Sequence, residues 1–331
     1  MTLPGLDTSR AQTLIARFGH RHVLVVGDVM TDRFIVGSVT RISPEAPVPV
    51  VRFESEYSRL GGAANVAHNL VALGAKVTLV GIVGADAAKD RLLDDLSSAG
   101  ISGDGLVQDG SRPTVEKVRI IAGRNQQVAR IDYEDDRDAV GDIEARLVER
   151  VTALGHDADV LLVSDYLKGT ITAAVMAALL ELKQKGAPLL VDPKIPHLQW
   201  YRGATVVTPN NHEAETATHR VIRSNDDAQA AALDFRERAG CEAVLITRGE
   251  HGMWLSSDMV EGAILATARE VADVAGAGDT VVATLALAVA AGGSLAEAAV
   301  LANHAAGVVV SKFGPATLTP HELLAVTSQD R

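Results

Sequence analysis

A single carboxylate late in the chain stands between a turn of small residues and a long apolar run. The turn is Gly276-Ala277-Gly278, the carboxylate is Asp279, and the run Thr280–Ala291 has the composition of a buried helix. Glycines let the backbone approach a ligand closely, and the first N–H groups of a helix, together with its dipole, favour an anion. The pattern therefore indicates a place where backbone amides hold a phosphate, or a phosphoryl group during its transfer.

Asp279 has two interpretations on sequence alone. A carboxylate is favoured in the first turn of any helix, so Asp279 could be no more than an N-terminal helix acid. Alternatively, it is the general base that removes a proton from an attacking hydroxyl while the amides stabilise the transferred phosphoryl group. The string G-A-G-D-T-V lacks the third glycine of a dinucleotide fingerprint, and no G-x-x-x-x-G-K-[ST] motif occurs, so those two phosphate sites are excluded.

Short apolar strands alternate with helical segments along most of the chain. They begin with His22–Gly27 and continue to Ala243–Thr247, which predicts a doubly wound, mainly parallel α/β sheet. We expect the polar clusters after these strands to meet at the carboxyl edge of the sheet, where such folds bind ligands. The clusters are Asp28, Ser164–Gly169, Asp192–Lys194, Thr208–Asn210 with Glu213, and Thr247–Gly249.

Two segments break this alternation and predict a small β lid over the site. Ser38–Phe53 has three prolines in six residues, which forbid a helix and disfavour a central strand. Two alternating runs, Val115–Ile121 and Gln127–Asp132, flank a short polar turn and predict a hairpin. Arg41 and Glu45 on the first segment could contact a substrate or be surface charges.

Two further positions have a structural and a functional alternative. Asp28 could bind a ligand or serve as a turn or cap residue after the first strand. Asn65 follows Gly61-Gly62, which allow close backbone approach, and it lies in the first turns of another helical segment. It could bind a ligand or bond to a neighbouring turn.

Composition limits the kind of protein. The 331 residues, 47% of them hydrophobic, suffice for one large α/β domain with a small appendage. A net charge of −11 disfavours nucleic acid and anionic membranes, so an anionic substrate requires a local basic pocket. The single cysteine, Cys241, the absence of a signal-peptide pattern and the shortness of the most apolar run together predict a cytoplasmic protein.

The motifs together resemble the ribokinase family of ATP-dependent sugar kinases. The matching stretches, in the family's order, are Gly61-Gly62-Ala63-Ala64-Asn65, Asn210-x-x-Glu213, Thr247-x-Gly249-x-x-Gly252 and Asp273-x-x-Gly276-Ala277-Gly278-Asp279. They cover nearly the whole chain, and several weak motifs in one correct order make a specific match. The resemblance implies one ribokinase-like kinase domain over residues 1–331, with lid segments at about 33–54 and 113–132.

Four further stretches are similar to the bacterial kinases of D-glycero-β-D-manno-heptose 7-phosphate, which act in ADP-heptose and lipopolysaccharide core synthesis. They are Arg41–Val50, Arg124–Gln127, Ser164–Gly169 and Asp192–Lys194. Many such proteins also carry a nucleotidyl-transferring domain with an H-x-G-H signature, which this sequence lacks. We therefore expect the stand-alone kinase form.

This resemblance implies transfer of the ATP γ-phosphoryl group to the C1 hydroxyl, which gives the 1,7-bisphosphate. Asp279 would be the base, and the amides of Gly276, Ala277 and Gly278 would form the anion hole. Glu213 would help to hold Mg²⁺ through water. The nucleotide side would comprise Asn210, Glu213, Thr247, Gly249, Gly252 and Asn303, and the sugar side Asp28, Gly61, Gly62 and Asn65.

The 7-phosphate is an anion and requires cations in its binding site. Arginine offers bidentate contacts to a phosphate, and lysine offers a point charge. The candidates, which the sequence does not rank, are Arg124, Arg130, Lys168 and Lys194, with Arg41 on the lid; Gln127 and Asp192 complete the predicted substrate set. The family also implies a homodimer joined through the lid.

Two alternatives stay open. One is a ribokinase-family kinase for a different sugar phosphate, for ribose or for a nucleoside. The other is a non-catalytic regulator that binds a sugar or a nucleotide on the same fold. Retention of Asp279 favours an enzyme, and a substrate panel distinguishes the kinases.

Overall fold

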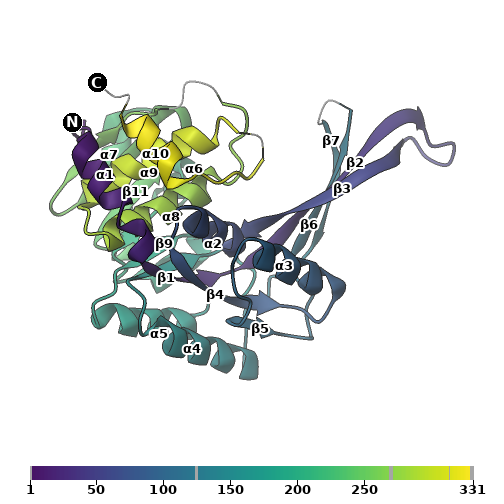
Figure 1. Cartoon of the computed structure of the whole chain (residues 1–331), viewed down its shortest axis with the longest axis horizontal. Coiled ribbons are helices and arrows are strands. Elements are labelled where there is room, and N and C mark those ends of the chain that lie inside the picture. The colour runs from purple at the N-terminus through teal and green to yellow at the C-terminus, as the bar shows by residue number, and fades with distance from the viewer. Residues whose placement is uncertain (1, 124–125, 268–270, 313, 329–331) are drawn as a thin grey trace.

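The computed structural model describes residues 2–123, 126–267, 271–312 and 314–328. In these residues a nine-stranded sheet forms the body, and a four-stranded sheet projects from one side of it (Figure 1). The body strands are β1 (His22–Gly27), β4 (Lys76–Val83), β5 (Leu106–Gln108), β8 (Val160–Ser164), β9 (Leu189–Asp192), β10 (Val206–Val207), β11 (Ala243–Thr247), β12 (Met253–Ser257) and β13 (Glu261–Ile264). The projecting strands are β2 (Val29–Ile42), β3 (Pro49–Gly62), β6 (Glu116–Ala122) and β7 (Gln126–Tyr133).

The body sheet has the order β13-β12-β11-β10-β9-β8-β1-β4-β5. All neighbours from β11 to β5 are parallel, whereas β12 pairs antiparallel with both β11 and β13. The predicted doubly wound, mainly parallel sheet is therefore confirmed. The antiparallel edge at β12 and β13 is an addition that the strand–helix alternation did not predict.

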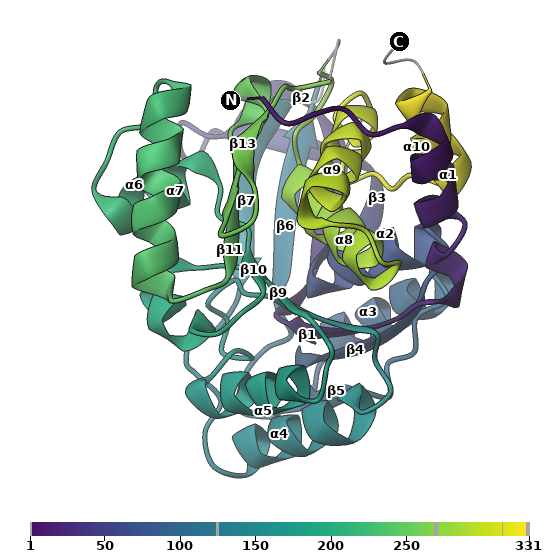
Figure 2. The ribbon, with the colours of Figure 1, turned by 90° about the vertical axis from the view of Figure 1, so that its left-hand side faces the viewer.

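Helices cover both faces of this sheet (Figure 2). They are α1 (Thr8–Ile15), α2 (Ala63–Ala72), α3 (Ala87–Ser98), α4 (Asp142–Gly155), α5 (Ala173–Gln184), α6 (Asn211–Thr218), α7 (Asn225–Ala239), α8 (Ala277–Ala290), α9 (Leu295–Val309) and α10 (Pro320–Thr327), with short 3-10 helices at Phe18–His20, Ile195–Tyr201 and Gly249–His251. Alternate residues of β1 enter two separate cores, Val23 and Val25 on one face and Leu24 and Val26 on the other. This alternation explains why the strand is apolar throughout.

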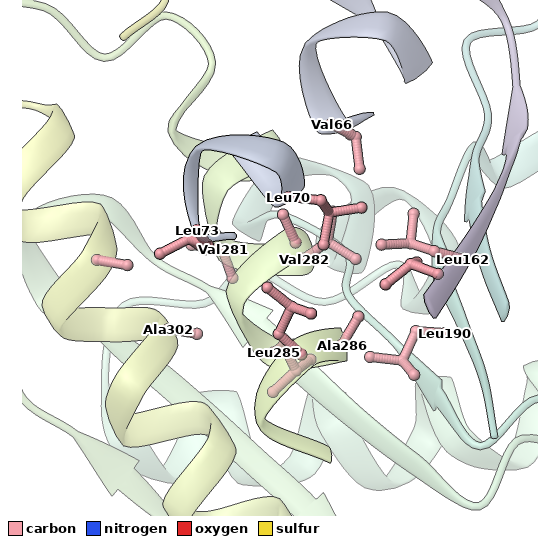
Figure 3. Close-up of a cluster of buried hydrophobic side chains, with 14 of the residues drawn as sticks. Val66, Leu70, Leu73, Leu162, Leu190, Val281, Val282, Leu285, Ala286 and Ala302 are labelled. Atoms are coloured by element: carbon pink, nitrogen blue, oxygen red, sulfur yellow. The ribbon is translucent and has the colours of Figure 1, made fainter. Parts of the chain in front are cut away.

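The helix that begins at the predicted anion site is buried along most of its length. Ten consecutive residues of α8, from Asp279 to Ala288, are buried. Val281, Val282, Leu285 and Ala286 pack among side chains of α2, α9 and the sheet (Figure 3). Because these residues are buried on all sides, the start of α8 is fixed rigidly relative to the carboxyl edge of the sheet.

The lid is continuous with the elements that form this edge. A single residue, Asp28, separates β1 from β2, and β3 ends at Gly62, directly before α2. In the lid, β2 pairs antiparallel with β3 and parallel with β6, and β6 pairs with the antiparallel β7. The first pair of lid strands, residues 29–42 and 49–62, extends beyond the predicted segment 33–54, and the second pair, residues 116–122 and 126–133, lies close to the predicted segment 113–132. In the described part of the chain, no helix combines the length and the hydropathy needed to cross a membrane.

Candidate active site

A cavity of about 810 Å³ lies between the lid and the start of α8. Its walls combine lid strands with the N-terminal ends of α2 and α8, so residues far apart in sequence meet there. The lining residues are Met30, Asp32, Phe34, Tyr57, Arg59, Leu60, Gly61, Gly62, Asn65, Lys117, Arg119, Ile121, Gln127, Arg130, Tyr166, Ala272, Asp273, Ala275, Gly276, Asp279, Gly314 and Pro315.

Asp279 lies in the first turn of α8 on the wall of this cavity and is only 5% exposed. Each of its carboxylate oxygens accepts one hydrogen bond from a neighbouring element. Asn65 Nδ2 donates to Oδ2 at 2.6 Å, and the hydroxyl of Tyr166 donates to Oδ1 at 3.0 Å. The carboxylate is therefore held in one orientation and still faces the cavity.

Burial is the main influence on the proton affinity of Asp279, and it raises the pKa to about 6. The hydrogen bonds from Asn65 and Tyr166 act in the opposite direction, as does the charge of Lys194, whereas the charge of Asp32 adds to the rise. A carboxylate with this pKa is ionised at neutral pH and is a better proton acceptor than an exposed aspartate. These properties suit a general base.

The turn before Asp279 requires a glycine at its helix-capping position. Gly276 has φ 76°, and a Cβ there would lie 2.8 Å from Asn65 Nδ2. The N–H of Ala277 already donates to the carbonyl of Val274 at 3.2 Å. An added Cβ at Gly278 would have no atom within 4 Å, so open space adjoins this residue. We therefore expect the amides of Gly276 and Gly278, more than that of Ala277, to face an anion.

Asn65 is positioned by two buried neighbours. Asn69, one turn further along α2, donates from its Nδ2 to the carbonyl of Asn65 at 2.9 Å. Thr280 donates from its hydroxyl to Asn69 Oδ1 at 2.8 Å and thereby links α8 to α2. The geometry of the Asn65–Asp279 pair is thus fixed by contacts outside the cavity.

The lid strands carry their cavity residues at alternating positions. Met30, Asp32 and Phe34 come from β2, Tyr57, Arg59 and Gly61 from β3, and Lys117, Arg119 and Ile121 from β6. Alternation follows from the pleat, which turns every second side chain to one face. The lid therefore contributes several cations to the wall, and these include three that the sequence analysis did not identify: Arg59, Lys117 and Arg119.

The lid cations lie beside carboxylates and aromatic rings. Arg119 donates to Asp32 Oδ1 at 2.6 Å, and Lys117 donates to Glu134 Oε2 at 2.9 Å. Phe34 and Tyr57 stack with ring centroids 4.8 Å apart, and the guanidinium of Arg59 lies 5.3 Å from the Tyr57 centroid. This end of the cavity is positively charged, with apolar ring faces beside the charges.

Of the predicted substrate residues, the structure places Gly61, Gly62, Asn65, Gln127 and Arg130 on the cavity wall. Arg130 forms a bidentate pair with Asp132 at 2.8 Å. Arg124, another predicted phosphate ligand, lies outside the described residues, as does Asn125.

The surroundings of Asp28 do not match the expectation that it binds a sugar hydroxyl. It is 2% exposed, and its oxygens accept backbone N–H groups of Tyr166, Lys168 and Thr170 at 2.8 to 3.0 Å. It is not among the cavity-lining residues. Asp32, four residues further on, lines the cavity instead, because the alternation of β2 directs it there.

The predicted phosphate ligands Lys168 and Lys194 also lie outside the cavity lining. Lys168 pairs with Asp136 at 2.6 Å and with Glu134 at 3.1 Å. Lys194 pairs with Glu213, and its Nζ is 5.4 Å from the ring centroid of Tyr166. Burial would lower the pKa of Lys194, but the charges of Glu213 and Asp192, at the end of β9, outweigh it and raise the pKa.

The residues predicted for the nucleotide side, apart from Asn303, form a separate group at the ends of β10 and β11. Asn210 and Glu213 form a capping box at the start of α6, in which each side chain accepts the other's backbone N–H at 2.9 Å. Asn210 forms a bridge with Thr247, the last residue of β11, and Gly249 and Gly252 follow with φ 55° and 74°. Asn303 in α9 donates from Nδ2 to the carbonyl of Leu265 at 2.8 Å.

This group could hold a magnesium ion only indirectly, through water, with phosphate oxygens as the main ligands. Glu213 Oε2 accepts the Asn210 N–H, and Oε1 accepts Lys194. No group of three or more His, Cys, Asp or Glu side chains suited to a metal occurs among the described residues. Since Mg²⁺ keeps several waters and is bound mainly by phosphate oxygens in such sites, one water-mediated carboxylate suffices.

Comparison with known proteins agrees with this architecture. Residues 20–322 match the family model described as pfkB family carbohydrate kinase. The match covers most of the chain, so the chain belongs to the pfkB family of carbohydrate kinases. By this membership it is an ATP-dependent sugar kinase.

Two relatives in the comparison share their name and align with nearly the whole chain. The chain is 50% identical over 317 residues to the bifunctional protein HldE of Caulobacter vibrioides, and 45% identical over 322 residues to that of Geobacter sulfurreducens. These alignments cover 94% and 96% of the chain but only 64% and 65% of the relatives, so the chain spans less than two thirds of their length.

Solved structures show the same fold at low sequence identity. Phosphofructokinase-2 from Escherichia coli, in complex with substrates and products, superposes with a TM-score of 0.77 at 18% identity. Ribokinase from Arabidopsis thaliana, complexed with ribose and ATP, gives 0.71 at 20% identity. Each alignment covers 93% of this chain and 98% of the other.

Proposed function

We propose that the chain transfers the γ-phosphoryl group of ATP to the anomeric hydroxyl of D-glycero-β-D-manno-heptose 7-phosphate and so forms the 1,7-bisphosphate. One observation carries the proposal: a single cavity joins the buried carboxylate of Asp279 to the lid cations. A sugar phosphate is complementary to this cavity, because its reactive hydroxyl can face the carboxylate while its dianion faces the cations. The sequence similarity to the HldE proteins supports a heptose in particular.

The reacting hydroxyl would lie against Asp279. Oδ1 and Oδ2 each have lone pairs left after the bonds from Tyr166 and Asn65, so the carboxylate can accept the proton as the oxygen attacks the γ-phosphorus. The amides of Gly276 and Gly278 would stabilise the charge on the transferred phosphoryl group. The ADP oxygen leaves on the opposite side, toward the strand ends that carry Asn210 and Thr247.

Other sugar hydroxyls would bind at the base of the lid. Asp32 is 9% exposed and offers acceptor oxygens, and Asn65 and the backbone at Gly61 and Gly62 adjoin the same space. Asp32 takes the role that the sequence analysis gave to Asp28. Arg119 donates a hydrogen bond to Asp32 and so links the sugar and phosphate ends of the cavity.

The 7-phosphate would bind among Arg59, Lys117, Arg119 and Arg130, all on lid strands that line the cavity. Guanidinium groups donate two hydrogen bonds to a phosphate, and such charge-assisted bonds are stronger than neutral ones. The carboxylates that these cations contact in the free enzyme, such as Glu134 and Asp132, would be partly exchanged for phosphate oxygens.

ATP would bind across the ends of β10 and β11, with Lys194 and Glu213 near its triphosphate. Magnesium, held by phosphate oxygens and through water by Glu213, supplies charge neutralisation when bound. Asn210 keeps Glu213 in place through the capping box. We also propose that two chains associate through the lid, as the family resemblance implies, and that the product enters ADP-heptose and lipopolysaccharide core synthesis.

A substrate panel tests this function. ADP release would be measured with heptose 7-phosphate, the same heptose without phosphate, fructose 6-phosphate, ribose and adenosine. We expect kcat/KM to be greatest for heptose 7-phosphate and about 100-fold lower for the unphosphorylated heptose, because two or three charge-assisted bonds are lost. A preference for another sugar would reject the heptose assignment, and ATP binding without turnover would favour a regulator.

A further inference from the structure

We propose that Tyr166 is a positioning residue for the base: its hydroxyl fixes the orientation of the Asp279 carboxylate. The inference rests on the role of Asp279 in the proposed function. Tyr166 follows β8 in the Ser164–Gly169 stretch, lines the cavity, and was not among the predicted site residues.

Two donors from different elements hold the carboxylate. Asn65 belongs to α2 and bonds Oδ2, whereas Tyr166 belongs to the loop after β8 and bonds Oδ1. Either bond alone would let the carboxylate rotate about its Cβ–Cγ bond. The two together fix the plane of the carboxylate, and with it the direction of the lone pairs that face the cavity.

The loop that carries Tyr166 is fixed by carboxylates that have no contact with the cavity. Asp28 accepts N–H groups from Tyr166 at 2.8 Å, from Lys168 at 3.0 Å and from Thr170 at 3.0 Å. Two of these three bonds flank Leu167, which has φ 57°. A left-handed leucine is unfavourable and persists only where its surroundings enforce it. The fold therefore bears a local cost to hold Tyr166 at this place.

A second buried carboxylate supports the loop from behind. Asp165, at 0% exposure, accepts the Leu167 N–H at 2.9 Å and the Tyr201 hydroxyl at 2.7 Å, and contacts His197 Nδ1 at 2.6 Å. Tyr201 in turn accepts the backbone N–H of Lys194 at 2.9 Å. The same network thus fixes Tyr166 on the sugar side and Lys194 on the nucleotide side of Asp279.

The groups around Asp279 determine how loss of the Tyr166 hydroxyl would change the pKa of Asp279. Burial raises the pKa of Asp279, and the charge of Asp32 adds to this, while Asn65, Tyr166 and Lys194 lower it. Asp192 is a further nearby carboxylate. Burial and the Asp279 charge raise the pKa of Tyr166 well above 10, so the phenol keeps its proton and remains a donor. Removal of this donor raises the pKa of Asp279.

The test is Tyr166→Phe, with Tyr133→Phe as the matched control. Tyr133 is on β7, 51% exposed and outside the cavity lining, so it undergoes the same chemical change away from the site. The Asp279 carboxyl carbon would be titrated by ¹³C NMR in the free enzyme, assigned by its loss in Asp279→Asn. We expect the pKa to rise by about one unit in Tyr166→Phe and to stay unchanged in Tyr133→Phe.

Kinetics complete the test. The acid limb of the kcat/KM profile for the sugar should move upward with the titration, and kcat at pH 7 should fall while the KM for ATP changes little. An unchanged Asp279 titration in Tyr166→Phe would overturn the inference, even if activity fell, because the ring alone would then matter. The titration needs no substrate, so a failed heptose assignment would be recognised separately by the substrate panel.

Discussion

Asp279 must be ionised to act as a base, yet it lies where ionisation is unfavourable. It is 5% exposed, and burial raises its pKa from 3.8 to about 6. Because the folded-state pKa lies above the unfolded one, the charge destabilises the fold. This cost is absent below pH 3.8 and complete above about pH 6. If Asp279 is the base, as we propose, the fold loses stability at neutral pH by keeping a carboxylate of raised proton affinity at this position.

We predict that Asp279→Asn abolishes turnover and stabilises the fold. The amide cannot accept the proton, and it removes a buried charge that costs about 1–3 kcal/mol at neutral pH. Turnover should fall at least ~1,000-fold, with ATP still bound. Urea unfolding should show a gain in stability at pH 7.5 that disappears near pH 4. Near-normal turnover would exclude Asp279 as the base, and equal stability at both pH values would contradict the charge argument.

At the scale of elements, the site divides between the lid strands and the strand ends of the body. Lys117 lies on β6 and lines the cavity, whereas Lys194 follows β9 and pairs with Glu213. The two lysines therefore serve different substrates in the proposed function. Lys194, which the sequence predicts at the sugar phosphate, lies outside the cavity lining and beside Glu213, and this position favours the nucleotide side instead.

Two matched substitutions test this division. Lys194→Ala should raise the KM for MgATP about tenfold and leave the KM for the sugar phosphate nearly unchanged. Lys117→Ala should do the reverse, because each change removes one charge-assisted contact worth about 1.5 kcal/mol. Steady-state kinetics with each substrate varied in turn would measure both values. Equal effects of one lysine on both substrates would reject the assignment of that lysine.

Much of the candidate site could be predicted from the sequence, and the misplacements have a physical cause. Motifs at strand and helix ends, such as Gly276–Asp279 and Asn65, are predictable because the fold fixes where those ends lie. The lid residues Arg59, Lys117 and Arg119 were not predicted, because strand register decides which face of the sheet a side chain occupies. Alternation along β2 directs Asp32 to the cavity, and the same rule applied to β6 identifies Lys117 and Arg119.

At the scale of the whole molecule, the alternating strands and helices predicted the parallel sheet, but not its antiparallel edge. Strands β12 and β13 are short and follow a tight 3-10 turn at Gly249–His251, so no helix separates them from β11. The lid was predicted from its prolines and its hairpin pattern. The lid exposes large apolar side chains: Val39, Ile42, Val48 and Phe53 are 40 to 61% exposed.

We predict that this surface joins two chains. Phe53→Glu should dissociate the dimer by placing a charge in an apolar contact, whereas Leu233→Glu on α7, at a side chain that is 50% exposed and remote from the lid, should not. Sedimentation velocity at micromolar concentration would measure the mass of each variant. A wild-type monomer, or a dimer that survives Phe53→Glu, would contradict the role of the lid surface.

Phosphorus NMR of the reaction product would show directly which hydroxyl receives the phosphoryl group. The protein would be incubated with ATP, Mg²⁺ and D-glycero-D-manno-heptose 7-phosphate, and the spectrum followed over time. We predict that the 7-phosphate resonance persists while a second resonance, coupled to the anomeric proton, grows in step with ADP. A new phosphate on any other carbon, or ATP loss without a sugar bisphosphate, would contradict it.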